Sequence, residues 1–230
     1  MKSTQETAPE MIPYWRSGET TFTKLPRGGH SISREDVLAS QKGRIIRATL
    51  ELIGEEGPAM VSISEVSRRA KISRKSFYEI FQSFDDCLRQ AFVTAHIVLG
   101  NEIAAAVEKS DKSKPYARIR AMVNEFFAMA TEEPVMSVAV VGTPYSTKNE
   151  IGPLWTEVRK AQTGIVTKYW AQDLKDLGKK GAADPRPAAK LAVVALIGTS
   201  ILDSLAAGQI DDLLGRVDET VDEIVHILSA

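Results

Sequence analysis

The sequence predicts an all-α protein in which a small N-terminal domain precedes a larger helical domain. Serine residues that are suited to cap a helix N-terminus precede four segments with helical spacing of apolar residues, at Ser33, Ser62, Ser73 and Ser83. From Tyr116 onward the pattern stays helical, without a convincing polar–apolar alternation that would indicate a strand. Two of the expected helices are short and nearly adjacent, which is typical of a helix-turn-helix.

The composition limits the classes of protein to consider. The 230 residues include one cysteine and carry a formal net charge of -1, so any affinity for nucleic acid must come from a local patch. The lone Cys87 excludes an internal disulfide framework and fits a reducing compartment, and its apolar neighbours favour a structural thiol over a redox sensor. No apolar run is long enough to span a bilayer and no signal-peptide pattern is present. We therefore expect a cytoplasmic protein without membrane contact.

Residues 62–86 predict two short helices and the start of a third. Ser62 and Glu65 have the spacing of a capping box, in which each residue caps the backbone of the other. Ser73 is the N-cap candidate of the second helix, and Phe77 and Phe81 follow it on one apolar face.

The first turn of that second helix presents groups suited to DNA. Arg and Lys can donate to guanine acceptors, and hydroxyl groups can bond phosphate oxygens or base edges. From Arg68 to Lys75 the chain holds cations and no acids. An ordinary solvated helix face remains the alternative interpretation of this charge run. The exposed candidates are Ser73, Arg74, Lys75, Ser76 and Tyr78.

Residues 42–92 resemble the N-terminal domain of the tetracycline-repressor-type (TetR/AcrR) transcriptional regulators. The resemblance lies in RIIRATLELIGEEG, SISEVSRRAKISRKSFYEIF and SFDDCLRQAF, including Tyr78 and Phe81 in a Tyr-x-x-Phe pattern. It implies that the helix after Ser73 reads the major groove, and we add Ser62 and Arg44 to the expected DNA contacts. Arg44 lies off the apolar stripe of its helix, where a solvated position is equally compatible with the pattern.

Three residues depart from the family pattern. Lys75 stands where the family often has Gly, which enlarges the expected reading surface. Phe84 stands where the family often has a phosphate-contacting Lys, so one backbone contact is expected to be missing. Lys71 replaces the usual Gly of the turn, where it either strains the backbone or supplies another phosphate contact.

The domain boundaries follow from breaks in the helical pattern. Residues 1–33 are expected to form a flexible extension, whose basic segment Lys24–His30 suggests an arm for the minor groove. Residues 34–108 would hold the DNA-binding domain and a long connecting helix. Residues 109–230 would form the effector-binding and dimerisation domain, in which residues 135–141 fit either a short helix or a strand.

The C-terminal domain of the resembled family implies an apolar ligand pocket between helices. Aromatic and Met residues at helical spacing are candidates to line it, although ordinary core packing explains the same spacing. The candidates are Phe92, His96, Met122, Phe126, Met136, Trp155 and Trp170, with Phe127 and Tyr169 as further possibilities.

Two C-terminal helices carry more apolar surface than one packed face needs. This surplus predicts a homodimer with a four-helix bundle, and a larger monomeric core is the alternative. The expected interface residues are Leu191, Val194, Ile201, Leu202, Leu205, Val221, Ile224, Val225 and Leu228.

The sequence thus predicts a sequence-specific DNA-binding regulator. The first hypothesis is a repressor that a small, mostly apolar ligand releases from a palindromic operator. The alternative is a helical protein-interaction module that has lost specific DNA reading, as Phe84 and the near-neutral charge would suggest. The three histidines are far apart, and no nucleophile elbow or phosphate-binding glycine loop is present. We therefore expect no enzymatic activity, no metal and no cofactor.

Overall fold

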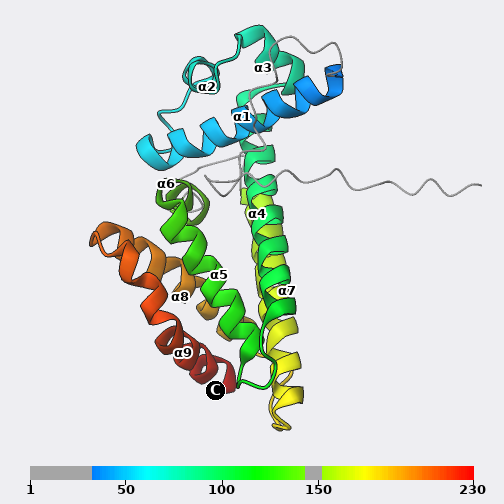
Figure 1. The fold of residues 1–230 in the computed structure, drawn as a ribbon, viewed down its shortest axis with the longest axis vertical. Coiled ribbons are helices and arrows are strands. Elements are labelled where there is room, and N and C mark those ends of the chain that lie inside the picture. The colour runs from blue at the N-terminus through cyan, green and yellow to red at the C-terminus, as the bar shows by residue number, and fades with distance from the viewer. Residues whose placement is uncertain (1–32, 143–151) are drawn as a thin grey trace, which may run out of the picture.

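The protein folds into a small helical head above a larger helical body (Figure 1). The structure is a computed structural model that describes residues 33–142 and 152–230, with the side chains of the second stretch described from Thr156 onward. Every regular element within these residues is helical, as the sequence predicts. The expected extension of residues 1–33 and its basic segment Lys24–His30 lie outside the described residues, apart from Ser33.

The head consists of α1 (Arg34–Glu56), α2 (Ile63–Ala70), α3 (Arg74–Ile80) and the first turns of α4 (Phe84–Lys109). All four serine caps form: each hydroxyl accepts the backbone N–H three residues later, at 3.0–3.2 Å. At Ser33 the full capping box is present. At Ser62 only half of it forms, because the Glu65 carboxylate accepts a hydrogen bond from Arg68 instead.

Aromatic side chains fill the core of the head. Phe77 and Phe81 are buried to 0% and 1% exposure, with ring centroids 5.5 Å apart. They share one hydrophobic cluster with Ile45 and Ile46 of α1 and with Val66 of α2. Burial of both rings fixes α3 against α1 and α2, so its opposite side must face solvent.

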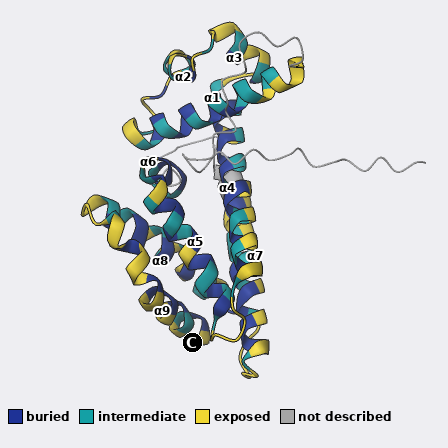
Figure 2. Cartoon of the chain, in the orientation of Figure 1, coloured by how far each residue is buried: buried dark blue, intermediate teal, exposed yellow. Residues whose placement is uncertain are grey.

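The body is arranged around α5 (Ala117–Glu132), which packs against helices that follow it in the chain. These are α7 (Gly152–Asp176), α8 (Pro187–Ala206) and α9 (Val217–Ser229), with the 3₁₀ segment η3 (Ile210–Arg216) before α9. Figure 2 shows buried residues on α5 and along the sides of α4 and α7. Residues 134–142 form a short helix, α6 (Pro134–Ser137), and a π-helical turn, η1 (Val138–Gly142), so the helical alternative for residues 135–141 is the observed one.

A buried carboxylate from α7 starts helix α5. Tyr116 precedes α5 in the left-handed conformation and makes no side-chain cap. Asp173 instead accepts the backbone N–H groups of Arg118 and Ile119 at 3.2 and 3.1 Å and pairs with the Arg118 side chain at 2.8 Å. A carboxylate at a helix N-terminus satisfies free N–H groups and complements the helix dipole. Long-range contacts therefore supply the cap that the local sequence lacks.

Two helices contradict the expectation that no apolar segment is long enough to span a bilayer. By length and composition alone, α4 and α8 are long and apolar enough to cross a bilayer. This property is weak evidence, because core helices of soluble proteins share it. In α4 the apolar residues Phe92, Leu99 and Ile103 pack into the hydrophobic cluster of the subunit.

Candidate DNA-reading surface and interior cavity

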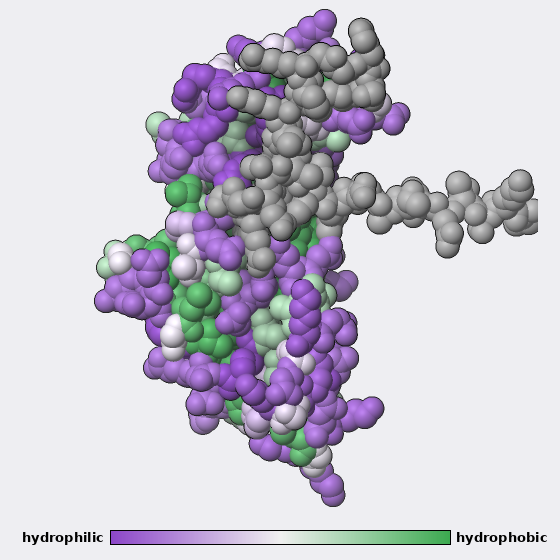
Figure 3. Space-filling model, viewed as in Figure 1, coloured by the Kyte–Doolittle hydropathy of each residue, from purple (hydrophilic) through white to green (hydrophobic). Residues whose placement is uncertain are grey.

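The first turn of α3 faces solvent. Ser73, Arg74 and Lys75 are exposed, and Ser76 is half-buried. Tyr78 is 52% exposed and meets the Phe77 ring edge-on, with centroids 5.6 Å apart. The hydrophilic surface of the head is visible at the top of Figure 3. Residues 73–78 thus present two cations and three hydroxyl groups at the start of α3.

Several cations of α1 and α2 form hydrogen bonds or ion pairs with other residues of the head. The Arg68 side chain contacts Glu65, and Arg69 makes two 2.7 Å bonds to Glu55. Arg44 is half-buried and donates to the Ala70 carbonyl at 3.0 Å, which ties α1 to the end of α2. The predicted phosphate contact at Arg44 therefore competes with a structural bond.

Among the described residues, Arg74 and Lys75 form no ion pair within 4.0 Å. The same holds for Lys71 within the part of the chain that the structure describes. Lys71 sits at φ 55° and ψ 49°, the left-handed conformation that Gly adopts at least cost. The turn accepts this strain and places an exposed ammonium group beside α3. Phe84, by contrast, is half-buried against the core and offers no charge.

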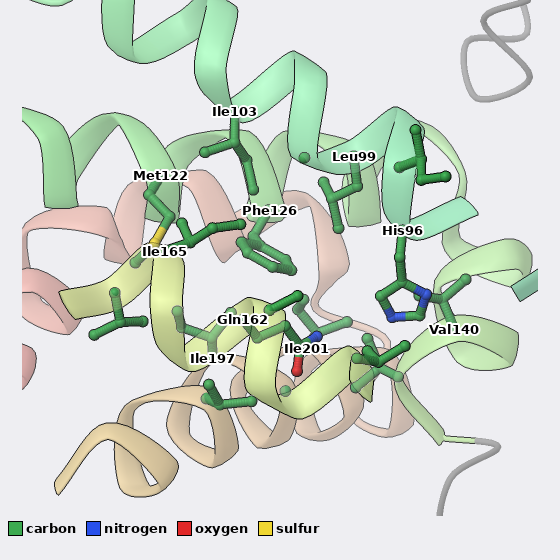
Figure 4. Close-up of a pocket in the computed structure, with 18 of the residues that line it drawn as sticks. His96, Leu99, Ile103, Met122, Phe126, Val140, Gln162, Ile165, Ile197 and Ile201 are labelled. Atoms are coloured by element: carbon green, nitrogen blue, oxygen red, sulfur yellow. The ribbon is translucent and has the colours of Figure 1, made fainter. Parts of the chain in front are cut away.

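A cavity of about 310 Å³ lies inside the body (Figure 4). Five elements form its walls: α4, α5, η1, α7 and α8. Most side chains that face it are aliphatic, and they include Leu99, Ile103, Val140, Ile165, Ile197 and Ile201. Ile97, which is 46% exposed, lies at its edge on α4. This volume and lining are those of a small-molecule site.

Three of the described side chains that line this apolar space are polar. The His96 Nδ1 atom lies 2.8 Å from the Phe92 carbonyl, and burial lowers the pKa of His96, so the neutral imidazole is favoured. The Gln162 Oε1 atom is shielded from solvent. Glu157 is exposed at the edge. No cluster of three or more His, Cys, Asp or Glu that could hold a metal ion occurs among the described residues.

Comparison with known proteins agrees with the geometry of the head. A sequence model described as "Bacterial regulatory proteins, tetR family" matches residues 45–91, which span the second half of α1, all of α2 and α3, and the start of α4. The head of this protein is a tetR-family domain. A search of curated proteins finds no match to this chain.

Solved structures share the fold of this protein over both head and body. FadR from Bacillus halodurans aligns with a TM-score of 0.71 at 15% identity, over 80% of this chain and 94% of that chain. FadR from Bacillus subtilis, in complex with stearoyl-CoA, gives 0.66 at 15%, over 81% and 97%. A TetR transcription regulator from Haloarcula marismortui gives 0.65 at 16%, over 84% and 100%. At these identities the likeness concerns the fold.

Three of the pocket residues expected from the sequence line the cavity: His96, Met122 and Phe126. Three others pack elsewhere and correct the expectation. Trp170 stacks on Tyr116 and donates its indole N–H to the Ala182 carbonyl at 3.0 Å. Phe92 and Met136, both 1% exposed, are part of the core, as are Phe127 and Tyr169. The side chain of Trp155 lies outside the described residues.

The cavity also has lining residues that the sequence analysis did not single out. Gly100 of α4, Ala161 of α7 and Gly198 of α8 border the space without filling it. A Cβ atom at Gly198 would stand 3.2 Å from a methyl group of Val141. Small residues inside helices were the available signal, but the same residues also permit ordinary close packing of helices.

The expected dimer residues divide into two groups. Four of them are buried in the core of their own subunit, with Ile201 and Ile224 at 0%, Val221 at 1% and Leu228 at 4% exposure, so they have no surface to offer a second subunit. Their apolar stripe instead packs α8 and α9 within the subunit. Leu191 is 45% exposed. The remaining expected residues, all half-buried, are Val194, Leu202, Leu205 and Val225.

Proposed function

We propose that this protein is a homodimeric transcriptional repressor that binds a palindromic operator and is released from it by a small, mostly apolar ligand. The observation that carries the proposal is the exposed first turn of α3, on which Arg74 and Lys75 have no internal ion pair among the described residues. Such a turn, on a helix held by buried Phe77 and Phe81, fits the major groove. The proposal implies a cytoplasmic protein.

Side chains of this turn have defined roles in the proposal. Arg74 and Lys75 would donate to guanine O6 and N7. The Ser73 oxygen accepts the Ser76 N–H, and the two hydroxyl groups lie 3.0 Å apart, so one of them donates to the other and the second can donate to a phosphate. Ser62 caps α2 in the same way. Ser76 and Tyr78 would add hydroxyl contacts, while Arg44 would position α2 rather than bind DNA directly.

The exposed side of α8 supports the dimer. Ala192, Ala195 and Thr199 are exposed on the same side of the helix as Leu191. Small and apolar residues along one exposed face permit close approach of a second helix, and a two-fold pair would match two operator half-sites. We therefore centre the proposed interface on α8, with Leu202 and Val225 at its border.

The cavity supports release by an apolar ligand. Its aliphatic lining gives such a molecule a favourable transfer from water. The B. subtilis FadR structure of the same fold is a complex with stearoyl-CoA, which carries a long apolar tail. That complex supports an apolar effector for this chain.

A packed joint connects the cavity wall to the head. Val140 and Val141 line the cavity on η1, which continues directly from α6. Glu133, which precedes α6, pairs with Arg47 of α1 at 3.1 Å. Gly54 of α1 packs so closely on the Val135 carbonyl that any Cβ atom would overlap with it. A ligand that shifts η1 would therefore move α1, and release follows if it binds better to the form with the two reading helices at the wrong spacing.

The second candidate function is a protein-interaction module that no longer reads a specific DNA sequence. The pairing of Arg68 and Arg69 with acids of the head and the uncharged Phe84 favour it, because they leave fewer cations for the DNA backbone. The two candidates differ in their affinity for specific DNA over random DNA.

Binding of the purified full chain to the DNA upstream of its own gene tests the proposal, at one stated salt concentration and with random DNA as competitor. We expect protection of a two-fold symmetric site. A genome-wide pull-down then covers distant operators. Absence of preference over random DNA in both experiments would contradict the proposed function and favour the interaction module.

A further inference from the structure

The polar atoms of the cavity specify what its ligand must offer. His96 projects into the space from α4 (Figure 4). Its Nδ1 atom lies 2.8 Å from the Phe92 carbonyl oxygen, which can only accept, so Nδ1 carries the hydrogen. In the neutral ring the other nitrogen, Nε2, then has a lone pair and no hydrogen. This Nε2 atom is shielded from solvent and is a hydrogen-bond acceptor.

Gln162 adds a second polar group from the α7 wall. Its Oε1 atom is buried and meets no donor among the described residues. A buried amide without a partner is costly, because the hydrogen bonds it made to water are not replaced. The two ends of an amide can exchange places by rotation, so Gln162 can either accept or donate.

Charge in the lining excludes one class of ligand group. Among the described residues that line the cavity there is no Lys or Arg side chain, and the only carboxylate is Glu157 at the exposed edge. A carboxylate or phosphate inside the cavity would lose its hydration without gaining a countercharge. The enclosed part of the ligand must therefore be uncharged.

We propose that the cavity binds an uncharged, mostly aliphatic molecule through a hydroxyl group placed between His96 and Gln162. The hydroxyl donates its proton to His96 Nε2 and uses its oxygen lone pairs for the Gln162 amide. A hydroxyl fits either orientation of that amide, because it both donates and accepts. This assignment of ligand class rests on the proposed function only in taking the cavity as the effector site.

The experiment uses the full chain and four probes with one ten-carbon tail: 1-decanol, its methyl ether, decanoate and decylamine. Affinity is measured by calorimetry at neutral pH without DNA. We expect 1-decanol to bind about tenfold tighter than the ether, which lacks the donor. Decanoate should bind at least about 100-fold more weakly than the alcohol, because its charge has no partner.

Matched variants assign the preference to residues. In His96→Phe and Gln162→Leu the advantage of the alcohol over the ether should fall to about twofold or less, as expected when the polar partner is lost. The control is Gln172→Leu, an exposed position on the same helix outside this cavity, which should retain the full advantage. Thermal melting of each variant confirms that it is folded.

Three results would overturn the assignment. Equal binding of alcohol and ether would remove the donor requirement, tightest binding of decylamine would transfer recognition to Glu157, and failure of all four probes would exclude an aliphatic alcohol. Operator binding is measured separately. If decanol binds as expected without weakening operator binding, the ligand class stands and release by ligand is wrong. If operator binding is intact but no probe binds, only the ligand class is wrong.

Discussion

The DNA-reading surface and the cavity are constructed differently from the same chain. The reading surface comes from one helical turn, residues 73–78, with its cap, its cations and its buried anchor close together in sequence. The cavity needs five elements that span residues 93–201, and no single one encloses it. A local surface depends on one helix being held in place, whereas an enclosed space depends on every wall.

A second difference concerns charge. In the head, Arg68 and Arg69 pair with acids of α1 and α2, while Arg74 and Lys75 of α3 have no ion pair among the described residues. The sequence alone does not distinguish these two kinds of cation, one paired with acids of the head and the other without such a pair. Among the described residues that line the cavity, Glu157 at the edge is the only acid or Lys/Arg side chain. His96 and Gln162 are the two other polar side chains in an otherwise apolar lining.

The largest expected effect comes from removing the anchor of the reading helix. Phe77→Ala empties a fully buried site and should lower the free energy of unfolding by about 3–5 kcal/mol. Phe126→Ala should cost less, because the Phe126 ring is only half-buried and already borders the cavity. Urea titration of both variants measures the difference. Equal losses would contradict the distinction between a packed head and a hollow body.

Disruption of the α8 face is expected to come next. Leu191→Glu places a charge on the proposed interface and should produce monomers in sedimentation, with operator affinity reduced at least about 100-fold through loss of the second half-site. Ala105→Glu, at an exposed position on α4, is the matched control and should stay dimeric. A dimeric Leu191→Glu variant would move the interface away from α8.

The joint between head and body gives a smaller effect. Glu133→Gln removes the charge that pairs with Arg47 in a mostly buried setting, and we expect a loss of about 1–3 kcal/mol in the free energy of unfolding. The control is Glu65→Gln, whose pair with Arg68 is screened by solvent and should contribute clearly less than the buried pair. If the Glu65 variant loses as much as the Glu133 variant, the joint has no special role in stability.

The smallest effect concerns Cys87 at the base of the head. Burial raises the pKa of this thiol from 9.0 to about 12, so the folded form keeps its proton where the unfolded chain loses it. Its contribution to stability is complete below pH 9 and is lost as the pH rises toward 12. By pH 10 the wild type should have lost about 1 kcal/mol more than Cys87→Ala. Parallel urea titrations at pH 8 and pH 10 measure this, and equal losses would contradict the burial of the thiol.

The sequence predicted the head more completely than the body. Serine caps and the buried Phe77 and Phe81 act within a few residues of one another, so spacing alone located α2 and α3. The pairing of Arg69 with Glu55 joins residues 14 positions apart, and the sequence analysis missed it. In the body, aromatic spacing marked both Phe126 and Trp170 as pocket candidates, and only Phe126 lines the cavity. Both patterns are helical, so only the tertiary contacts decide which side chain borders a void.

The dimer prediction shows the same limit. An apolar stripe on α9 indicated an interface, yet Val221, Ile224 and Leu228 pack within the subunit. Periodicity tells which face of a helix is buried but not which molecule covers it. The spacing also predicts helices over residues 188–207 and from about Val217, and α8 and α9 agree with this to within a residue, because Pro, Gly and charged residues mark the boundaries locally.

The central claim is that α3, and not the cationic end of α2, reads the operator. Its most direct test compares Arg74→Ala and Lys75→Ala with Arg68→Ala, each titrated on the operator and on random DNA at the same salt concentration. The account predicts that each α3 variant loses about 1–3 kcal/mol on the operator with relaxed sequence preference, while Arg68→Ala stays within about 0.5 kcal/mol. A loss for Arg68→Ala as large as for Arg74→Ala, or unchanged operator binding in both α3 variants, would contradict it.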